Sequence, residues 1–228
     1  MTEIEIYNLW NYYLNLENDL SVTSRYIEPN GQEEVFSLEY SKLLILICTE
    51  AETVFKILCK EIDGVERGNI GEYKEAILTR FPKITTAEVI IPRWAETVIP
   101  FEGWDSGRLE WWDAYVDVKH SRVKNFQKAT YKNSVYSLSA LNILIFYLTS
   151  LTGHRLSILN SNIDAYIWSP YAYKNVISSP DRFLPDFEPS DQSENKSVDD
   201  ILHSTTVYTQ EAEPKDARNG DIWVRTEG

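Results

Sequence analysis

The sequence predicts a mainly α-helical bundle followed by an irregular, partly extended C-terminal region. Apolar residues recur at three- and four-residue steps through several long segments, which is the pattern of amphipathic helices. The longest gap between those segments contains Pro82, Pro92 and Pro100, which interrupt any helix there. With 228 residues, 43% of them apolar and 25% charged, the composition is that of a globular protein with one main domain.

Two helices are expected in the first quarter of the chain, over residues 4–21 and 37–62. The first carries an apolar stripe made of Leu9, Tyr13, Leu16 and Leu20. Ser37 is a favourable N-cap for the second helix, and Asp63-Gly64 predicts its end. Within this helix the segment Leu43–Cys48 is apolar on all sides, so it is expected to be the most buried part of the chain.

Both cysteines, Cys48 and Cys59, fall in the second of these helices. Eleven helical residues separate them by roughly 16 Å, whereas a disulfide needs Cα atoms within about 7 Å of each other. Buried, reduced thiols are therefore expected, which fits a cytoplasmic location. The chain has no Cys-x-x-Cys pair and its three histidines are scattered, so the sequence predicts neither a metal site nor a cofactor.

The segment between residues 72 and 104 is expected to be mostly non-helical. Only a short helix near residues 72–80 fits its pattern. The three prolines that follow predict an extended connection over Phe81–Trp104, with a short strand at Val89–Ile91.

Two long helices are then expected, over about residues 108–131 and 134–152, and Gly153 predicts the end of the second. The short joint Lys132-Asn133 predicts that they form an antiparallel hairpin. The second has no charged residue between Lys132 and His154, a length that could in principle cross a bilayer. Because serine, threonine and asparagine interrupt it and no aromatic belt flanks it, a buried core helix is expected and no membrane association.

The helix expected over residues 108–131 carries the residues of greatest chemical interest. On an ideal helical wheel its apolar stripe consists of Trp112, Val116, Val123, Phe126 and Thr130. Lys119 falls at the centre of that stripe, so it must extend to solvent or find an acidic partner, and Glu52 is the predicted partner. A second face carries Asp113, Asp117, His120 and Lys124, and is continued by Lys128 and Lys132.

Five cations follow one another along this stretch without an intervening acid, namely Lys119, Arg122, Lys124, Lys128 and Lys132. The whole chain has 22 Lys and Arg against 35 Asp and Glu and a net charge of -13; with these five cations set aside the charge is -18. Such a balance argues against a protein that coats nucleic acid by bulk charge, but a local basic stripe can hold a phosphate or a strand backbone. The alternative is a solvated helix end whose charges are balanced by acids elsewhere.

The run from Trp111 to Arg122, Trp-Trp-Asp-Ala-Tyr-Val-Asp-Val-Lys-His-Ser-Arg, opens the predicted hairpin and resembles the Lys-His-x-Arg variant of HEPN-like helical domains. The earlier helix over Ser37–Lys60, with Glu52 and Lys56, is similar to that group's earlier helix. The resemblance covers roughly residues 4–152. It implies an RNA-directed role in a bacterial or phage conflict system, as a metal-independent ribonuclease or as an RNA- or nucleotide-binding protein, and a homodimer.

His120 and Arg122 are the candidate catalytic residues under this resemblance. His120 would act as general acid or base toward a ribose 2′-hydroxyl or the leaving group. Arg122 would stabilise phosphate charge. The side chains of Lys119, Lys124 and Lys128 would bind the nucleic-acid backbone.

Two positions depart from the family's ribonuclease pattern, Arg-Asn/His-x-x-x-His. With the pattern's last histidine aligned on His120, Tyr115 stands where its arginine belongs and Val116 where its polar residue belongs. Arg122 points about 160° away from His120 on an ideal helix, so a second chain would have to supply the arginine. A non-catalytic protein-interaction module that keeps the fold is therefore the alternative.

Beyond residue 153 the helical pattern fades. Residues 1–153 are predicted as the helical domain, 154–187 as an irregular extension packed on it, 188–206 as an acidic linker and 207–228 as an extended tail. Within the tail, Glu213–Asp216 and Gly220–Val224 resemble the Pro…Gly-Asp-x-Trp segments of phage tail and fibre proteins. This resemblance implies a small β element and adds a phage structural or accessory protein to the alternatives.

Overall fold

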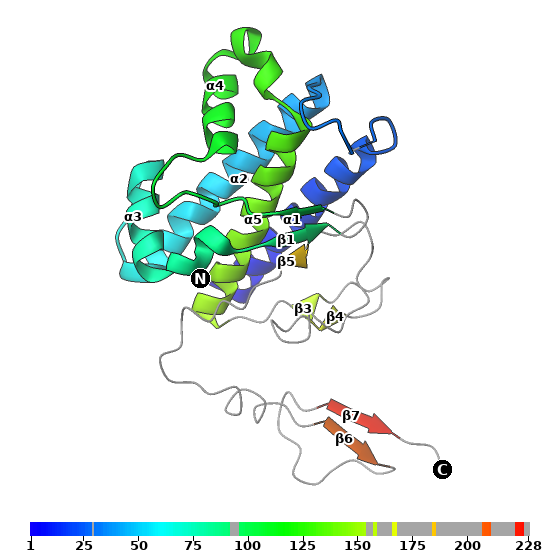
Figure 1. Cartoon of the computed structure of the whole chain (residues 1–228). Helices are drawn as coiled ribbons and strands as arrows, with labels where there is room; N and C mark the ends of the chain where they lie inside the picture. The colour runs from blue at the N-terminus through cyan, green and yellow to red at the C-terminus, as the bar shows by residue number, and fades with distance from the viewer. Residues whose placement is uncertain are drawn as a thin grey trace. The chain divides into compact units, whose positions relative to one another are not determined.

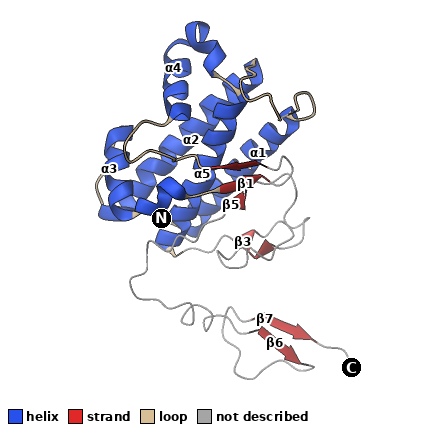
Figure 2. Cartoon of the chain, viewed as in Figure 1, coloured by secondary structure: helices blue, strands red, loops and turns tan. Residues whose placement is uncertain are grey.

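The computed structural model describes residues 1–28, 30–91 and 96–153, and beyond them only the backbone of a few short strands. The chain groups into two units, Met1–Asp191 and Gln192–Gly228. Helices make up most of the described part of the first unit (Figure 2). They are α1 (Glu3–Thr23), α2 (Leu38–Asp63), α3 (Ile70–Arg80), α4 (Glu110–Asn125) and α5 (Tyr131–Thr152) (Figure 1). The predicted mainly α-helical bundle is confirmed.

Helix α5 is the centre of this bundle. It packs against α2 most extensively, and also against α1 and α4. Every side chain from Leu138 to Leu148 is buried, whereas Ile45 and Leu46 within Leu43–Cys48 are only partly buried. The most buried segment is therefore α5 and not the first half of α2, because α5 has neighbours on all sides.

The predicted helix ends on α2 and α5 are confirmed. The Ser37 hydroxyl accepts a hydrogen bond from the Tyr40 backbone N–H at 3.1 Å, which makes Ser37 the N-cap of α2. Gly64 and Gly153 end α2 and α5 with φ angles of 79° and 68°, a left-handed conformation that glycine adopts without a Cβ penalty. Local chemistry thus sets these boundaries.

The connection between α3 and α4 is less extended than predicted. It begins with a 3₁₀ helix, η1 (Pro82–Thr86), because a proline is well tolerated at a first helical position. The predicted strand is present as β1 (Val89–Ile91), which pairs antiparallel with β2 (Glu96–Val98) and with β5 (Leu184–Pro185). The three strands form a small sheet in the order β2-β1-β5.

The predicted boundaries of the hairpin are wrong. The backbone of α4 is non-helical at Ser121 (φ -154°, ψ 78°), and a 3₁₀ turn, η3 (Phe126–Lys128), follows. Thr130 then caps α5, so Lys132 and Asn133 lie in its first turn and not in a joint. The cause is side-chain competition for backbone groups: Asn125 Nδ2 donates to the Asp117 carbonyl at 2.8 Å, and Asn133 Nδ2 to the Lys128 carbonyl at 2.9 Å.

Short strand pairs lie further along the chain. β3 (Ser157–Ile158) pairs antiparallel with β4 (Tyr166–Ile167) in the first unit. In the second unit β6 (Val207–Gln210) pairs with β7 (Ile222–Arg225) in parallel. The remainder of the predicted extension, linker and tail lies outside the described residues.

Among the described helices, α5 has the length and apolar composition that crossing a membrane requires. In this structure 78% of its most apolar 18-residue stretch is buried inside the chain. Packing of this kind is also what the core helix of a bundle shows.

Replacing a side chain of α5 by alanine should destabilise the fold far more than the same replacement at the end of α4. Leu144→Ala is expected to lower the free energy of unfolding by about 2–5 kcal/mol, because Leu144 is fully buried. Val123→Ala, at a side chain that is 93% exposed, should change it by no more than about 0.5 kcal/mol. Urea unfolding followed by circular dichroism measures both, and equal losses would contradict the central position of α5.

Candidate nucleic-acid interface

Tyr115 lies at the contact between α4 and α2. Its hydroxyl donates to Glu52 Oε2 at 3.3 Å and accepts from Lys119 Nζ at 2.8 Å. The Lys119 ammonium also lies 3.6 Å from the same Glu52 oxygen. The predicted Lys119–Glu52 pair is therefore confirmed, and Tyr115 joins its two members.

Nearby charges and burial shift the pKa of the Glu52 carboxyl in opposite directions. Partial burial alone would raise the pKa of the Glu52 carboxyl, but the ammonium of Lys56, followed by Lys119 and Tyr115, brings that pKa below its usual value. The hydrogen bond to Tyr115 raises the pKa of Lys119. Burial, with the nearby Glu52 charge, raises the pKa of Tyr73 to about 12. The cluster thus keeps Glu52 and Lys119 ionised and holds α4 to α2.

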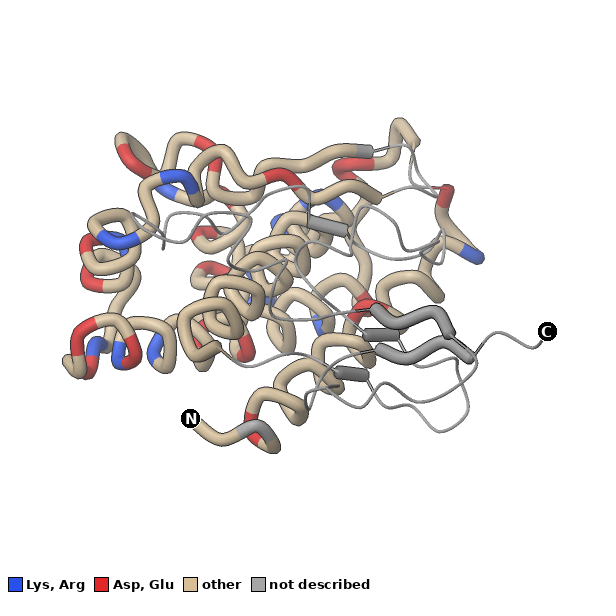
Figure 3. The backbone as a smooth tube through the Cα atoms, turned by 90° about the horizontal axis from the view of Figure 1, so that it is seen from below, with Lys and Arg blue, Asp and Glu red and all other residues tan. Residues whose placement is uncertain are grey.

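Three of the five cations in the predicted basic stripe have carboxylate partners. Lys119 pairs with Glu52 as above, Lys128 pairs with Asp117, and Lys132 pairs with Glu110 at 2.7 Å. Basic and acidic positions are interspersed along the described helices (Figure 3). The charge available to a phosphate is therefore much smaller than the sequence count of five.

His120, Arg122 and Lys124 remain exposed at the end of α4. Among the described residues none of the three has a hydrogen bond or an ion pair. They lie on either side of Ser121, where the helical backbone is broken, so the angle that an ideal wheel gives between His120 and Arg122 does not apply. Within the described part of one chain no hydrogen bond joins these two side chains.

Of the predicted apolar stripe of α4, Trp112 and Thr130 are buried and Val116 and Phe126 are partly buried, so the prediction is wrong at Val123 alone. The buried side chains are Trp111, Trp112, Ala114, Tyr115 and Val118. Val116 and Phe126 are only partly buried, Thr130 is the cap of α5, and Val123 is 93% exposed. A wheel for one continuous helix cannot apply beyond Ser121, where the backbone changes direction.

The loop before α2 lies against the turn after α4. Phe36 packs edge to face on Phe126 with ring centroids 5.4 Å apart, and pairs with Thr130 as an isolated β-bridge. The Tyr131 backbone N–H donates to the Val35 carbonyl at 2.8 Å. Sequence reasoning missed Phe36, which is 48% exposed, because no periodic pattern distinguishes an aromatic residue in this loop.

Comparisons with protein-family models, with curated proteins and with solved structures find no match to this chain. Across the described residues, no group of three or more His, Cys, Asp or Glu side chains could hold a metal ion. Cys48 and Cys59 are both free and buried, as predicted, and burial raises the pKa of the Cys59 thiol to about 11.

Glu52→Ala should destabilise the protein more than Lys119→Met. The alanine leaves the buried Tyr115 hydroxyl without its acceptor, a cost of about 1–3 kcal/mol. Methionine in place of Lys119, whose side chain is 53% exposed, removes a surface ion pair and should cost less than about 1 kcal/mol. Urea unfolding of both variants tests the order, and the reverse order would mean that Lys119 and not Glu52 holds α4 in place.

Proposed function

We propose that this chain is a HEPN-like, non-catalytic protein that binds RNA phosphates through the exposed end of α4. The observation that carries the proposal is the contrast within the basic stripe. Lys119, Lys128 and Lys132 are held by carboxylates, whereas Arg122 and Lys124 have no partner among the described residues. Cations that no acid neutralises are the ones that can release counterions from a nucleic acid.

The geometry around His120 favours binding over cleavage. The position where the family pattern has an arginine is occupied by Tyr115, which is 1% exposed and engaged with Glu52 and Lys119. The arginine that the family pattern places on the same helix face as the histidine is therefore absent from this chain. General acid–base chemistry by His120 would lack the arginine that stabilises phosphate charge in the family pattern.

A protein-interaction module is the second candidate. Val123, between Arg122 and Lys124, is 93% exposed. Its side chain therefore contributes little to the stability of the fold and is free to contact another molecule. A single exposed apolar residue is ordinary on a protein surface, so this candidate depends on Val123 together with the two unpaired cations beside it. This candidate shares the end of α4 with the first and differs in its ligand.

Removing the two unpaired cations should weaken RNA binding. Arg122→Gln with Lys124→Gln should reduce the affinity for a single-stranded RNA several-fold and lower the salt dependence, log K against log salt, by about 1.4, since each phosphate contact to a single strand contributes about 0.7. Lys42→Gln with Lys74→Gln changes the net charge equally and should leave binding unchanged. Fluorescence anisotropy over a salt series measures both, and equal effects would show that only overall charge matters.

His120→Ala should leave RNA integrity unchanged, because wild-type protein is expected to cleave weakly or not at all. The assay incubates purified protein with labelled single-stranded RNA in the presence of a chelator. Metal-independent cleavage that falls by on the order of 10²-fold in His120→Ala would overturn the non-catalytic proposal, since a loss of that size is typical of a general acid or base. Cleavage that persists in His120→Ala would indicate a site elsewhere.

A further inference from the structure

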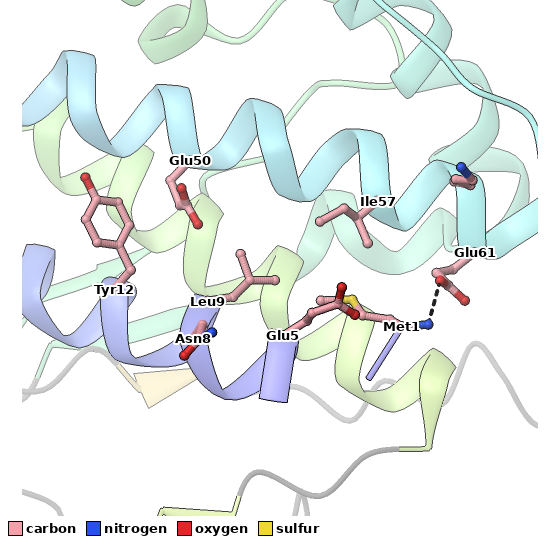
Figure 4. A pocket seen from close by; sticks show the side chains of 9 residues that line it. Met1, Glu5, Asn8, Leu9, Tyr12, Glu50, Ile57 and Glu61 are labelled. Carbon is pink, nitrogen blue, oxygen red and sulfur yellow. Dashed lines mark hydrogen bonds and ion pairs between the residues drawn. The ribbon is translucent and has the colours of Figure 1, made fainter. Parts of the chain in front are cut away.

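A groove of about 750 Å³ runs between the first half of α1 and the part of α2 from its middle to its end. Its floor is apolar, with Leu9 from α1 and Ile57 from α2, and Tyr12 stands at one end (Figure 4). Glu50 points into the groove beside Tyr12, and Glu61 lies toward the other end (Figure 4). The groove therefore combines an apolar surface with carboxylates.

Glu50 is the carboxylate of this groove that lacks a partner. The carboxylate of Glu5 accepts the Thr2 backbone N–H at 2.7 Å, and Glu61 lies 3.4 Å from the Met1 ammonium. Lys60, the lysine of the groove, is held by Glu66 at 2.8 Å. Glu50 has no hydrogen bond or ion pair among the described residues, and its partial burial raises the pKa of its carboxyl. A cation brought from outside would stabilise its charged form.

The end of α4 presents the complementary surface. Val123 is 93% exposed, and the flanking Arg122 and Lys124 have no acidic partner among the described residues. Glu50 and Glu61 lie about 16 Å apart along α2, by the rise of an α-helix. One of the two cationic side chains can reach the unpaired Glu50, and the other the rim near Glu61, which already pairs with the Met1 ammonium, while Val123 covers Leu9 and Ile57.

The two surfaces of one chain cannot meet each other. The end of α4 lies beside the loop that precedes α2, as the contact between Phe36 and Phe126 shows. The groove begins at Glu50, about 18 Å along α2 from Leu38 by the rise of a helix, and continues away from that end to Glu61. Any contact between groove and α4 end must therefore join two molecules.

We propose that the groove between α1 and α2 binds the Arg122-Val123-Lys124 end of α4 from a second copy of this chain. Groove and α4 end are different surfaces, so the contact is head to tail and leaves one of each free on a dimer. The evidence for this contact comes from the groove and is independent of RNA binding. The contact occupies the cations proposed to bind RNA, so the two associations compete.

The test is the mass of the full chain in solution, measured by sedimentation at low ionic strength over a range of concentrations. Wild type should exceed the 26.4 kDa of one chain as concentration rises, and high salt should reverse this. Glu50→Lys blocks the groove, and Val123→Asp with Lys124→Glu blocks the α4 end; each should weaken association tenfold or more. Glu50→Gln, which preserves the shape of the side chain, serves where Glu50→Lys fails to fold.

Mixing the two blocked variants gives the decisive result. Glu50→Lys retains an intact α4 end and the Val123→Asp, Lys124→Glu variant retains an intact groove, so an equimolar mixture should form a one-to-one dimer and nothing larger. A wild-type protein that stays monomeric overturns the proposal. Binding of a basic peptide from another protein in the groove would not rescue it, because the proposed occupant is a second copy of this chain. Association that survives in both variants, or a mixture that stays monomeric, overturns it as well. Loss of RNA binding alone leaves it standing, so failure of the RNA proposal is distinguishable.

Discussion

The whole helical unit depends on the burial of one uncharged helix. α5 has no charged side chain after Lys132, and its residues from Leu138 to Leu148 are all buried. Removing that much apolar surface from water is the dominant favourable contribution available to the fold. It requires neighbours on all sides, which α1, α2 and α4 provide. The positions of those three helices follow from this requirement.

The placement of α4 adds a polar constraint to this apolar one. Tyr115 is buried against α2 and finds its hydrogen-bond acceptor in Glu52, while Lys119 reaches the same carboxylate from one turn further along. Leaving the Tyr115 hydroxyl unpaired would cost as much as several surface ion pairs provide, so its hydrogen bond to Glu52 stabilises the contact between α4 and α2. The residue that departs from the ribonuclease pattern therefore has a structural role, and that role prevents it from serving as a phosphate ligand.

Acidic residues determine what the basic stripe can do. Five consecutive cations in sequence become two without a carboxylate partner, because Glu52, Asp117 and Glu110 pair with the other three. A net charge of -13 repels polyanions at long range, so RNA binding would depend on short-range contacts at the end of α4. The same unpaired cations, with Val123 between them, are complementary to the acidic groove of α1 and α2. Both proposals, RNA binding and self-association, therefore depend on the exposed residues at the end of α4.

The sequence by itself determined the number of long helices, the caps at Ser37, Gly64 and Gly153, the reduced state of the buried cysteines and the partner of Lys119. Each of these follows from local chemistry or from the periodicity of apolar residues. Tertiary structure decided where α4 ends, which of its faces is buried and which of its cations are free. These depend on the backbone break at Ser121, on the hydrogen bonds of Asn125 and Asn133 to carbonyls, and on acids up to 67 residues away in sequence. A helical wheel assumes a continuous helix and contains no information about the elements that pack against it. Only the folded chain could therefore place His120, Arg122 and Lys124 at an exposed end.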